Sequence, residues 1–223
     1  MRHVFFDLDG TLTDSREGIL RCLRHALAAV GRIAPEDAVL ERTIGLPLRE
    51  VLAELTGGAA NGLGDLALRA YRQRYRAVGM FENRLYPGVV DCLTSLRAGG
   101  LGLSVVTAKV GIFAEQILEH YGIRPFFSAV YGPDLSGEGA RKTPLIRRAL
   151  SGEGLDPRQA VMVGDRAEDI EGARANGLRA IAVGWGYGSR EELTLARPDL
   201  LVEDVAGLCV ALMAGSPGGG RGA

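Results

Sequence analysis

From residue 88 onward, helix-like segments alternate with short apolar runs. The runs lack the apolar–polar alternation of a half-exposed strand, and continuously apolar strands are typical of a parallel sheet covered by helices on both faces. We therefore expect an α/β fold with a doubly wound parallel sheet and right-handed crossovers. The helical segments are 88–98, 111–121, 143–150 and 167–175, and the apolar runs are 101–107, 126–132, 160–165, 179–186 and 199–204.

A region without strand pattern separates the first apolar run, residues 4–6, from this alternation. Apolar residues at helical spacing mark its four segments, 15–30, 35–42, 47–56 and 64–78. We therefore expect a Rossmann-like core of residues 1–14 and 85–214, interrupted by an all-helical subdomain of residues 15–84. The glycine-rich end, residues 215–223, is expected to be disordered.

Composition excludes several classes of protein. The net charge of −1 over 223 residues gives no sign of a nucleic-acid or anionic-membrane partner. No apolar run approaches the roughly 18 residues of a membrane span, and Asp7 comes too early for a secretory signal. The three cysteines, Cys22, Cys92 and Cys209, lack metal spacing and are expected to be reduced thiols, so we expect a cytoplasmic protein. The oligomeric state is not readable from the sequence.

Polar residues follow the apolar runs at the ends where an open α/β sheet binds its ligands. Four carboxylates, one hydroxyl and both lysines of the chain are expected at this edge: Asp7, Asp9, Asp165, Asp169, Thr107, Lys109 and Lys142. Singly, an aspartate here would be a turn residue or helix cap, Asp169 a first-turn acid, Thr107 a cap and each lysine a surface charge. Their joint occurrence at successive strand ends favours a site.

The spacing of Asp7 and Asp9 indicates a cation site. Residues two apart in an extended chain share a side, so the two carboxylates would repel one another unless a divalent cation lay between them. Asp165 would supply a third oxygen ligand, and oxygen ligands without nearby histidine or cysteine favour Mg²⁺ over Zn²⁺. The glycine and hydroxyls after Asp9, with Thr107 and the lysines, would hold a phosphoryl group.

The two lysines are unusual in this chain because 24 of its 26 basic residues are arginine. Lysine presents a compact charge where the planar arginine side chain is too bulky. The retention of Lys142 therefore suggests a position that arginine does not fill.

Four segments resemble the motifs of the haloacid dehalogenase superfamily, in its phosphatase branch. They are DLDGTLTDS (7–15), VVTAK (105–109), RKTPLIRRAL (141–150) and VGDRAEDIEGARANG (163–177). The helical insertion resembles the small α-helical cap of phosphoglycolate phosphatase-like members. The resemblance implies an Mg²⁺-dependent phosphatase that hydrolyses a small phosphorylated metabolite.

The resemblance also implies residue roles. Asp7 would be the nucleophile that forms an aspartyl-phosphate, and Asp9 the general acid/base. Mg²⁺ would be bound by the Asp7 carboxylate, the Asp9 carbonyl oxygen and Asp165. Asp169 and Lys109 would support the site, whereas Thr107 and Lys142 would hold the phosphoryl oxygens.

Two positions depart from the family pattern, since Ala108 stands where many relatives have asparagine and Arg166 where many have serine or threonine.

Asp9 argues against a dehalogenase, whose leaving group needs no proton. The absence of lysine from residues 15–84 argues against phosphonate cleavage through a Schiff base. A phosphohexomutase with the same core and a non-catalytic phosphate-binding protein remain as alternatives.

The helical subdomain is expected to set the substrate by closing on a hinge near residues 14 and 85. Its candidate substrate contacts are Arg49, and Glu17 or Arg16 near the first hinge. The other arginines of its last helix, Arg72, Arg74 and Arg76, are expected to form a solvated face.

Overall fold

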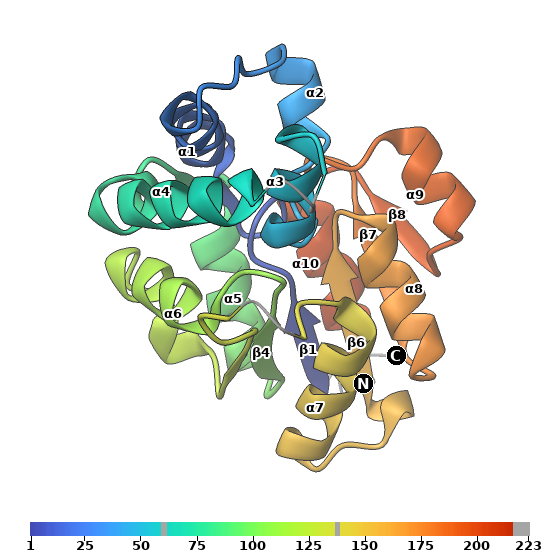
Figure 1. Ribbon diagram of the computed structural model, residues 1–223. Coiled ribbons are helices and arrows are strands. Elements are labelled where there is room, and N and C mark those ends of the chain that lie inside the picture. Colours follow the sequence, from blue (N-terminus) through green and yellow to red (C-terminus); the bar gives the residue numbers. More distant parts are fainter. Residues whose placement is uncertain (59–61, 137–138, 216–223) are drawn as a thin grey trace, which may run out of the picture. The chain divides into compact units, whose positions relative to one another are not determined.

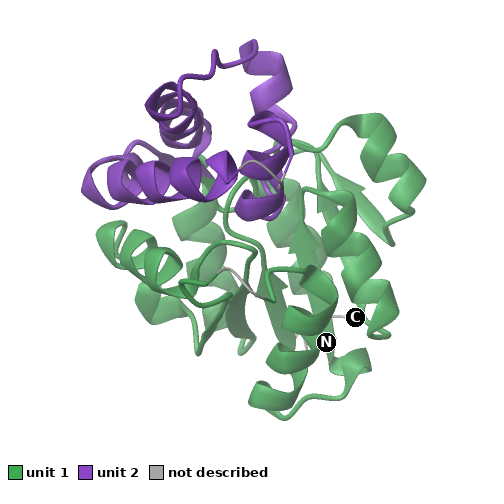
Figure 2. Ribbon diagram, viewed as in Figure 1, with its two compact units in different colours: residues 1–13, 85–223 green, residues 14–84 purple. Residues whose placement is uncertain are grey.

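The computed structural model describes residues 1–58, 62–136 and 139–215 (Figure 1). The chain divides into two compact units, here called unit 1 (Met1–Thr13 and Leu85–Ala223) and unit 2 (Asp14–Arg84), which Figure 2 shows in different colours. The chain passes between them through β2 (Thr13–Asp14) and β3 (Arg84–Leu85), two strands that pair. Of the expected disordered tail, Gly215 follows the last helix, and the rest lies outside the described residues.

Unit 1 is built on a six-stranded sheet in the order β5-β4-β1-β6-β7-β8. Every neighbouring pair is parallel, which confirms the doubly wound α/β fold. The central strand β1 is buried along its whole length, as the apolar run at residues 4–6 predicts. The strands are β1 (His3–Phe6), β4 (Gly102–Val106), β5 (Val130–Tyr131), β6 (Ala160–Gly164), β7 (Arg179–Val183) and β8 (Leu200–Val202).

Helices cover both faces of this sheet (Figure 1). Helices α7 and α8 pack against each other on one face, and α5 and α10 do so on the other. Between these helices and the sheet, Ile146 of α7 and the strand residues Phe5 and Met162 are fully buried, each a gain of about 1.5–3 kcal/mol over exposure. The helices of unit 1 are α5 (Val89–Ala98), α6 (Gly111–His120), α7 (Lys142–Glu153), α8 (Ala167–Ala175), α9 (Arg190–Ala196) and α10 (Val205–Ala214).

The run at residues 126–132 forms much less strand than its sequence suggests. Val130–Tyr131 form the strand that pairs with β4, whereas Arg124–Phe126 form a 3-10 turn. Between them, the Ser128 N–H donates to the Leu103 carbonyl oxygen and the Ala129 carbonyl oxygen accepts the Val105 N–H. Phe127 is buried by packing rather than by strand pairing, with its ring edge toward Phe6.

Unit 2 is helical among its described residues, apart from the terminal residues of β2 and β3. Its helices are α1 (Arg16–Ala29), α2 (Asp37–Glu41), α3 (Leu48–Leu55) and α4 (Leu63–Ala77), followed by a 3-10 turn at Gly79–Phe81. Helices α1 and α4 pack along their apolar faces, which bury Leu23 and Leu68 among others. Gly18 lets α1 lie close to the 3-10 turn at Gly79–Phe81, because a Cβ at residue 18 would lie 2.1 Å from the Gly79 carbonyl oxygen.

The expectation of a solvated arginine face on α4 is wrong for Arg74. Its guanidinium meets Glu82 in two hydrogen bonds of 2.7 and 3.1 Å and contacts the Cys22 sulfur at 3.1 Å. The pKa of Glu82 is lowered chiefly by the hydrogen bond from Arg74. The sequence of α4 alone does not indicate this pairing, because Glu82 lies in the segment that follows the helix.

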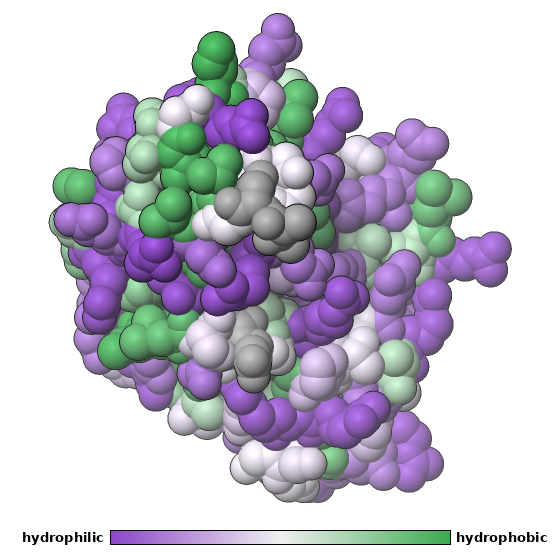
Figure 3. Space-filling view, viewed as in Figure 1, coloured by the Kyte–Doolittle hydropathy of each residue, from purple (hydrophilic) through white to green (hydrophobic). Residues whose placement is uncertain are grey.

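Hydrophilic side chains predominate on the face seen in Figure 3, with hydrophobic residues in separate groups. Among the described residues, no helix combines the length and apolar character needed to cross a lipid bilayer.

Candidate active site

Three adjacent strands bring the expected site residues to one edge of the sheet. Asp7 follows β1, Thr107 follows β4 and Asp165 follows β6, and the strands are in register there because Phe6 pairs with Val105 on one side and Val163 on the other. All three side chains are buried. Parallel pairing of β1 with both neighbours therefore places the residues that follow the three strands side by side.

The chain turns sharply after Asp7. The Leu8 carbonyl oxygen accepts the N–H groups of Leu12 (2.9 Å) and Thr13 (3.0 Å), which closes the turn. Gly10 has φ +83°, and a Cβ there would lie 2.2 Å from Asp165 Oδ2. Only glycine combines that backbone conformation with so close an approach to a carboxylate.

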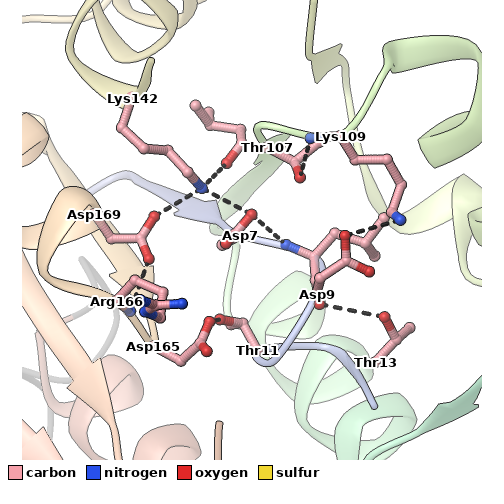
Figure 4. Close-up of polar contacts among 12 residues, drawn as sticks. Asp7, Asp9, Thr11, Thr13, Thr107, Lys109, Lys142, Asp165, Arg166 and Asp169 are labelled. Atoms are coloured by element: carbon pink, nitrogen blue, oxygen red, sulfur yellow. Dashed lines mark hydrogen bonds and ion pairs between the residues drawn. The ribbon is translucent and has the colours of Figure 1, made fainter. Parts of the chain in front are cut away.

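Lys142, the first residue of α7, connects two of the carboxylates. Its ammonium lies 2.7 Å from Asp7 Oδ1, 2.7 Å from Asp169 Oδ1 and 2.9 Å from the Val106 carbonyl oxygen (Figure 4). These three acceptors match the three N–H donors of a lysine. Burial alone would lower the pKa of Lys142, but the charges of Asp169 and Asp7 raise it above the usual value, so the side chain is a cation.

Asp165 is held by two donors, one on each carboxylate oxygen. The Thr11 hydroxyl donates to Oδ1 (3.1 Å), and the Tyr187 backbone N–H donates to Oδ2 (2.8 Å). Glycines on either side of Tyr187 let the chain pass this closely, since a Cβ at Gly186 would lie 2.2 Å from Asp165 Cβ and one at Gly188 2.0 Å from the Asp165 carbonyl oxygen. Sequence reasoning missed this contact, although the alternating glycines of residues 184–188 were its signal.

The electrostatics of the cluster favour a bound cation. One oxygen each of Asp7, Asp165 and Asp169 lies within 4.8 Å of the others, and Lys142 is the cation in contact with two of them. Burial raises the pKa of Asp7 to about 6 despite Lys142, and burial with the charges of Asp7 and Asp169 raises the pKa of Asp165 well above its usual value. An all-carboxylate oxygen set with such repulsion fits a hard divalent cation.

Asp9 stands apart from this trio and pairs with the second lysine. Its Oδ2 lies 2.9 Å from the Lys109 ammonium, and both side chains are largely buried. Within the described residues, the other oxygen, Oδ1, is buried without a hydrogen-bond donor. Thr107 Oγ1 accepts the backbone N–H of Lys109 at 3.2 Å, so Thr107 shapes the turn that carries this lysine.

The candidate substrate residues of unit 2 form ion pairs within that unit, and Arg166 of unit 1 forms one with α9. In unit 2, exposed Arg49 pairs with Asp65, and exposed Glu17 pairs with Arg21 at 2.6 Å. In unit 1, Arg166 does not lie open at the site edge, because its Nε donates to Glu192 of α9 at 2.9 Å.

Comparison with known proteins identifies the family of this chain. A family model described as "Haloacid dehalogenase-like hydrolase" matches residues 4–183. The chain therefore belongs to the haloacid dehalogenase-like hydrolase family, which confirms the resemblance of its sequence motifs.

Three related proteins illustrate the activities assigned to sequences similar to this chain. A protein of Pseudomonas aeruginosa named 5'-nucleotidase is 41% identical over 206 residues, which are 92% of this chain and 93% of that protein. A phosphoglycolate phosphatase of Agrobacterium fabrum is 30% identical over 94% of this chain and 91% of its own length. The Mycobacterium tuberculosis protein named tyrosine-protein kinase PtkA is 40% identical over 83% of this chain, which spans 62% of it. The first two names agree with the expectation of a phosphoric monoester hydrolase.

The fold is shared with solved structures. A predicted phosphatase from Clostridium acetobutylicum has a TM-score of 0.90 and 36% sequence identity, and the match covers 95% of this chain and 98% of that one.

Proposed function

We propose that this protein is an Mg²⁺-dependent phosphatase that hydrolyses a small phosphomonoester through an aspartyl-phosphate on Asp7. The observation that carries the proposal is the placement of Asp7. It is buried, touches the Lys142 ammonium at 2.7 Å and has an oxygen within 4.8 Å of oxygens of Asp165 and Asp169. A nucleophile beside one fixed cation and an oxygen-lined cation site suits transfer of an anionic phosphoryl group.

The metal ligands in this proposal are Asp7, the main-chain carbonyl of Asp9 and Asp165, with Asp169 in support. Their buried, mutually repelling carboxylates fit a small hard cation. When bound, Mg²⁺ would supply positive charge against the phosphoryl oxygens.

In the first step, an oxygen of Asp7 attacks phosphorus and the bond to the leaving oxygen breaks. Asp7 Oδ1 already accepts the Leu8 N–H (2.7 Å) and touches Lys142, so we assign the attack to Oδ2. The electron pair of the broken bond goes to the leaving oxygen, which takes a proton from Asp9. The donor-free Oδ1 of Asp9 is the atom we assign to this transfer.

In the second step, water attacks the phosphorus of the aspartyl-phosphate. Asp9 takes the water's proton, the Asp7–phosphorus bond breaks, and inorganic phosphate leaves with Asp7 again a carboxylate. Thr107 holds the phosphoryl oxygens through both steps. Lys142, whose three donors meet protein acceptors in this structure, would exchange one of these contacts for a phosphoryl oxygen. Lys109 keeps Asp9 in place through its 2.9 Å contact.

Residues 15–84 serve in this proposal as the cap that selects the substrate, with Arg49 and Glu17 as its candidate contacts. The names of the relatives direct the first trials to nucleoside 5'-monophosphates and phosphoglycolate. Small phosphorylated substrates of this kind are consistent with the cytoplasmic location that we expect for the protein.

The test is phosphate release from a panel of phosphomonoesters with Mg²⁺ and with EDTA. The panel contains nucleoside 5'-monophosphates, phosphoglycolate, hexose phosphates, phosphotyrosine and pyrophosphate. We expect release from at least one small monoester, and its loss in EDTA. An isomerised hexose phosphate without phosphate release would show a mutase instead, and phosphate binding without turnover of any compound would show a binding protein.

The nucleophile is tested by Asp7→Asn, which we expect to abolish release and the ³²P label trapped on the protein by acid quenching. Asp91→Asn, a change of an exposed aspartate on α5, is the matched control and should leave both unchanged. Wild-type activity in Asp7→Asn would refute the assigned mechanism.

A further inference from the structure

Helix α8 begins with a residue that cannot cap it. The cap position is Arg166, whose backbone is extended (φ −124°, ψ 156°), and the first helical residue is Ala167. The first N–H groups of a helix have no acceptor within the helix, and serine, threonine, asparagine or aspartate usually supplies one. An arginine side chain has donors only.

Glu192 of α9 supplies the missing acceptor from another helix. Its Oε1 accepts the backbone N–H of Ala167 and the side-chain Nε–H of Arg166, both at 2.9 Å. The two side chains of this pair are mostly shielded, with 14% of Arg166 and 25% of Glu192 exposed. One carboxylate oxygen thus fixes both the start of α8 and the side chain that stands in place of a cap.

This turn carries the support of the site. Arg166 comes directly after Asp165, and its backbone N–H donates to Asp169 Oδ2 at 3.1 Å. The other oxygen of Asp169 touches Lys142 at 2.7 Å. A shift of the Arg166–Ala167 backbone would therefore move the carboxylate that positions Lys142 (Figure 4).

The segment that carries Glu192 is itself anchored. The Ser189 hydroxyl accepts the Glu192 N–H at 3.0 Å, and Leu193 is buried. Two residues before Ser189, the Tyr187 N–H donates to Asp165. The segment 187–193 thus contacts the site at two points, Asp165 and the start of α8.

We propose that Glu192 is a positioning residue for the active site, acting as a helix cap in trans for α8 in place of a capping side chain at residue 166. Its effect on turnover rests on the proposed function, but its effect on the start of α8 does not. Removal of Glu192 frees the first turn of α8 and loosens Asp169 and Lys142.

The first experiment compares Glu192→Ala with Glu191→Ala. Both glutamates lie in the first turn of α9, and Glu191 is exposed, so the control removes the same charge at the same helix end. We expect faster amide hydrogen exchange at residues 167–169 in Glu192→Ala only. We also expect the Mg²⁺ concentration for half-maximal turnover to rise about 10- to 100-fold, as for loss of other residues that orient metal ligands.

The second experiment is a rescue. Arg166→Ser placed in Glu192→Ala puts a capping hydroxyl at the start of α8, which can accept the N–H of Glu168 or Asp169. We expect the double variant to regain slow exchange and most of the Mg²⁺ affinity. Glu192→Gln keeps an acceptor oxygen and should lie closer to wild type than Glu192→Ala.

Wild-type exchange and Mg²⁺ dependence in folded Glu192→Ala would overturn the proposal, as would a double variant no better than the single one. If Glu192→Ala does not fold, Glu192→Gln decides: unchanged exchange with turnover like wild type supports the cap, and exchange as fast as in unstructured peptide overturns it. If the wild type shows no phosphatase activity, the proposed function fails, and the exchange arm still tests Glu192.

Discussion

Lys142 and Asp7 form a buried ion pair in which Nζ and Oδ1 are 2.7 Å apart and the side chains are 3% and 5% exposed. The same ammonium also meets Asp169 and the Val106 carbonyl oxygen, so its position is fixed from three directions. Its stem is confined as well, because a Cβ on Gly172 would lie 3.0 Å from Lys142 Cβ. The pair joins the proposed nucleophile to helix α7.

Lys142→Met should lower kcat/KM by about 10²- to 10³-fold, as for loss of a donor to a transition-state anion. Without Mg²⁺ it should also lower the free energy of unfolding by about 3–5 kcal/mol, because buried carboxylates lose their counter-charge. Lys142→Arg should restore the charge but little activity, since the planar fork does not fit three acceptors around one nitrogen. Steady-state kinetics and denaturant unfolding measure both effects.

Arg147→Met is the control on the same helix, where the side chain is exposed. Near-wild-type kinetics in Lys142→Met would remove Lys142 from the phosphate-holding group.

Gly10→Ala should reduce activity more than its backbone strain alone explains. The Cβ would press on Asp165 Oδ2 from 2.2 Å, and the residue has φ +83°. Gly122→Ala separates the two effects, because Gly122 has φ +68° with nothing within 4 Å of its Cβ position. We expect about 1–2 kcal/mol of destabilisation in the control from the left-handed backbone, and a larger loss together with weaker Mg²⁺ binding in Gly10→Ala.

The measurements are thermal unfolding and the Mg²⁺ dependence of turnover. Equal stability losses and equal Mg²⁺ affinities in the two variants would show that Gly10 is required only for its backbone conformation.

The sequence was sufficient to predict the parallel sheet and the edge where Asp7, Thr107 and Asp165 meet, because those residues directly follow apolar strands whose carboxyl ends share one edge. It was insufficient for contacts between distant segments. Nothing near Arg166 in sequence indicates that it donates to Glu192, 26 residues later. Nothing in α4 indicates that Arg74 donates to Glu82.

Secondary structure was missed where local signals were weak. Helices α9 and α10 were not expected. Helix α10 is rich in apolar residues, so it lacks a clear polar face to mark it. Strand β5 is only two residues long because Arg124–Phe126 turn before it.

Folding stability should fall on mild acidification through His3. Its Nε2 hydrogen-bonds Ser104 at 2.9 Å, and Ser104 also bonds Glu153. Burial lowers the pKa of His3 below 6.5, with Glu153 opposing and Arg97 adding to the shift. The unfolded chain therefore binds the proton more readily, so the stability that His3 contributes is present above pH 6.5 and is lost as the pH falls below it, by at most about 1.4 kcal/mol per pH unit.

The quantity to measure is the difference in unfolding free energy between wild type and His3→Gln from pH 7.5 to 5. Asp7 titrates in the same range with the opposite sign, because its raised pKa of about 6 favours the folded state at low pH. Its contribution cancels in the difference. A difference independent of pH would show that His3 remains charged or equally protonated in both states.

The final prediction concerns Asp165, for which stability and metal binding should change in opposite directions. In the metal-free protein its carboxylate is fully buried and repelled by Asp7 and Asp169, and its pKa is raised well above the usual value. The substitution Asp165→Asn would keep the shape of the side chain without its charge. The amide oxygen of the new side chain can accept the Tyr187 N–H, and its NH₂ can donate to the Thr11 hydroxyl oxygen, so both hydrogen bonds at this position survive.

Asp165→Asn should therefore unfold at a higher temperature than wild type in EDTA. Saturating Mg²⁺ should stabilise the wild type by about 2.7 kcal/mol at 100 times its dissociation constant and leave Asp165→Asn almost unchanged. Trp185, the one tryptophan of the chain, donates from its indole to the Thr11 carbonyl oxygen at 3.2 Å and should report the same binding by fluorescence. An Asp165→Asn protein that is less stable in EDTA and still stabilised by Mg²⁺ would show that Asp165 holds the turn at Thr11 rather than a cation, and would move the proposed metal site to Asp7 and Asp169.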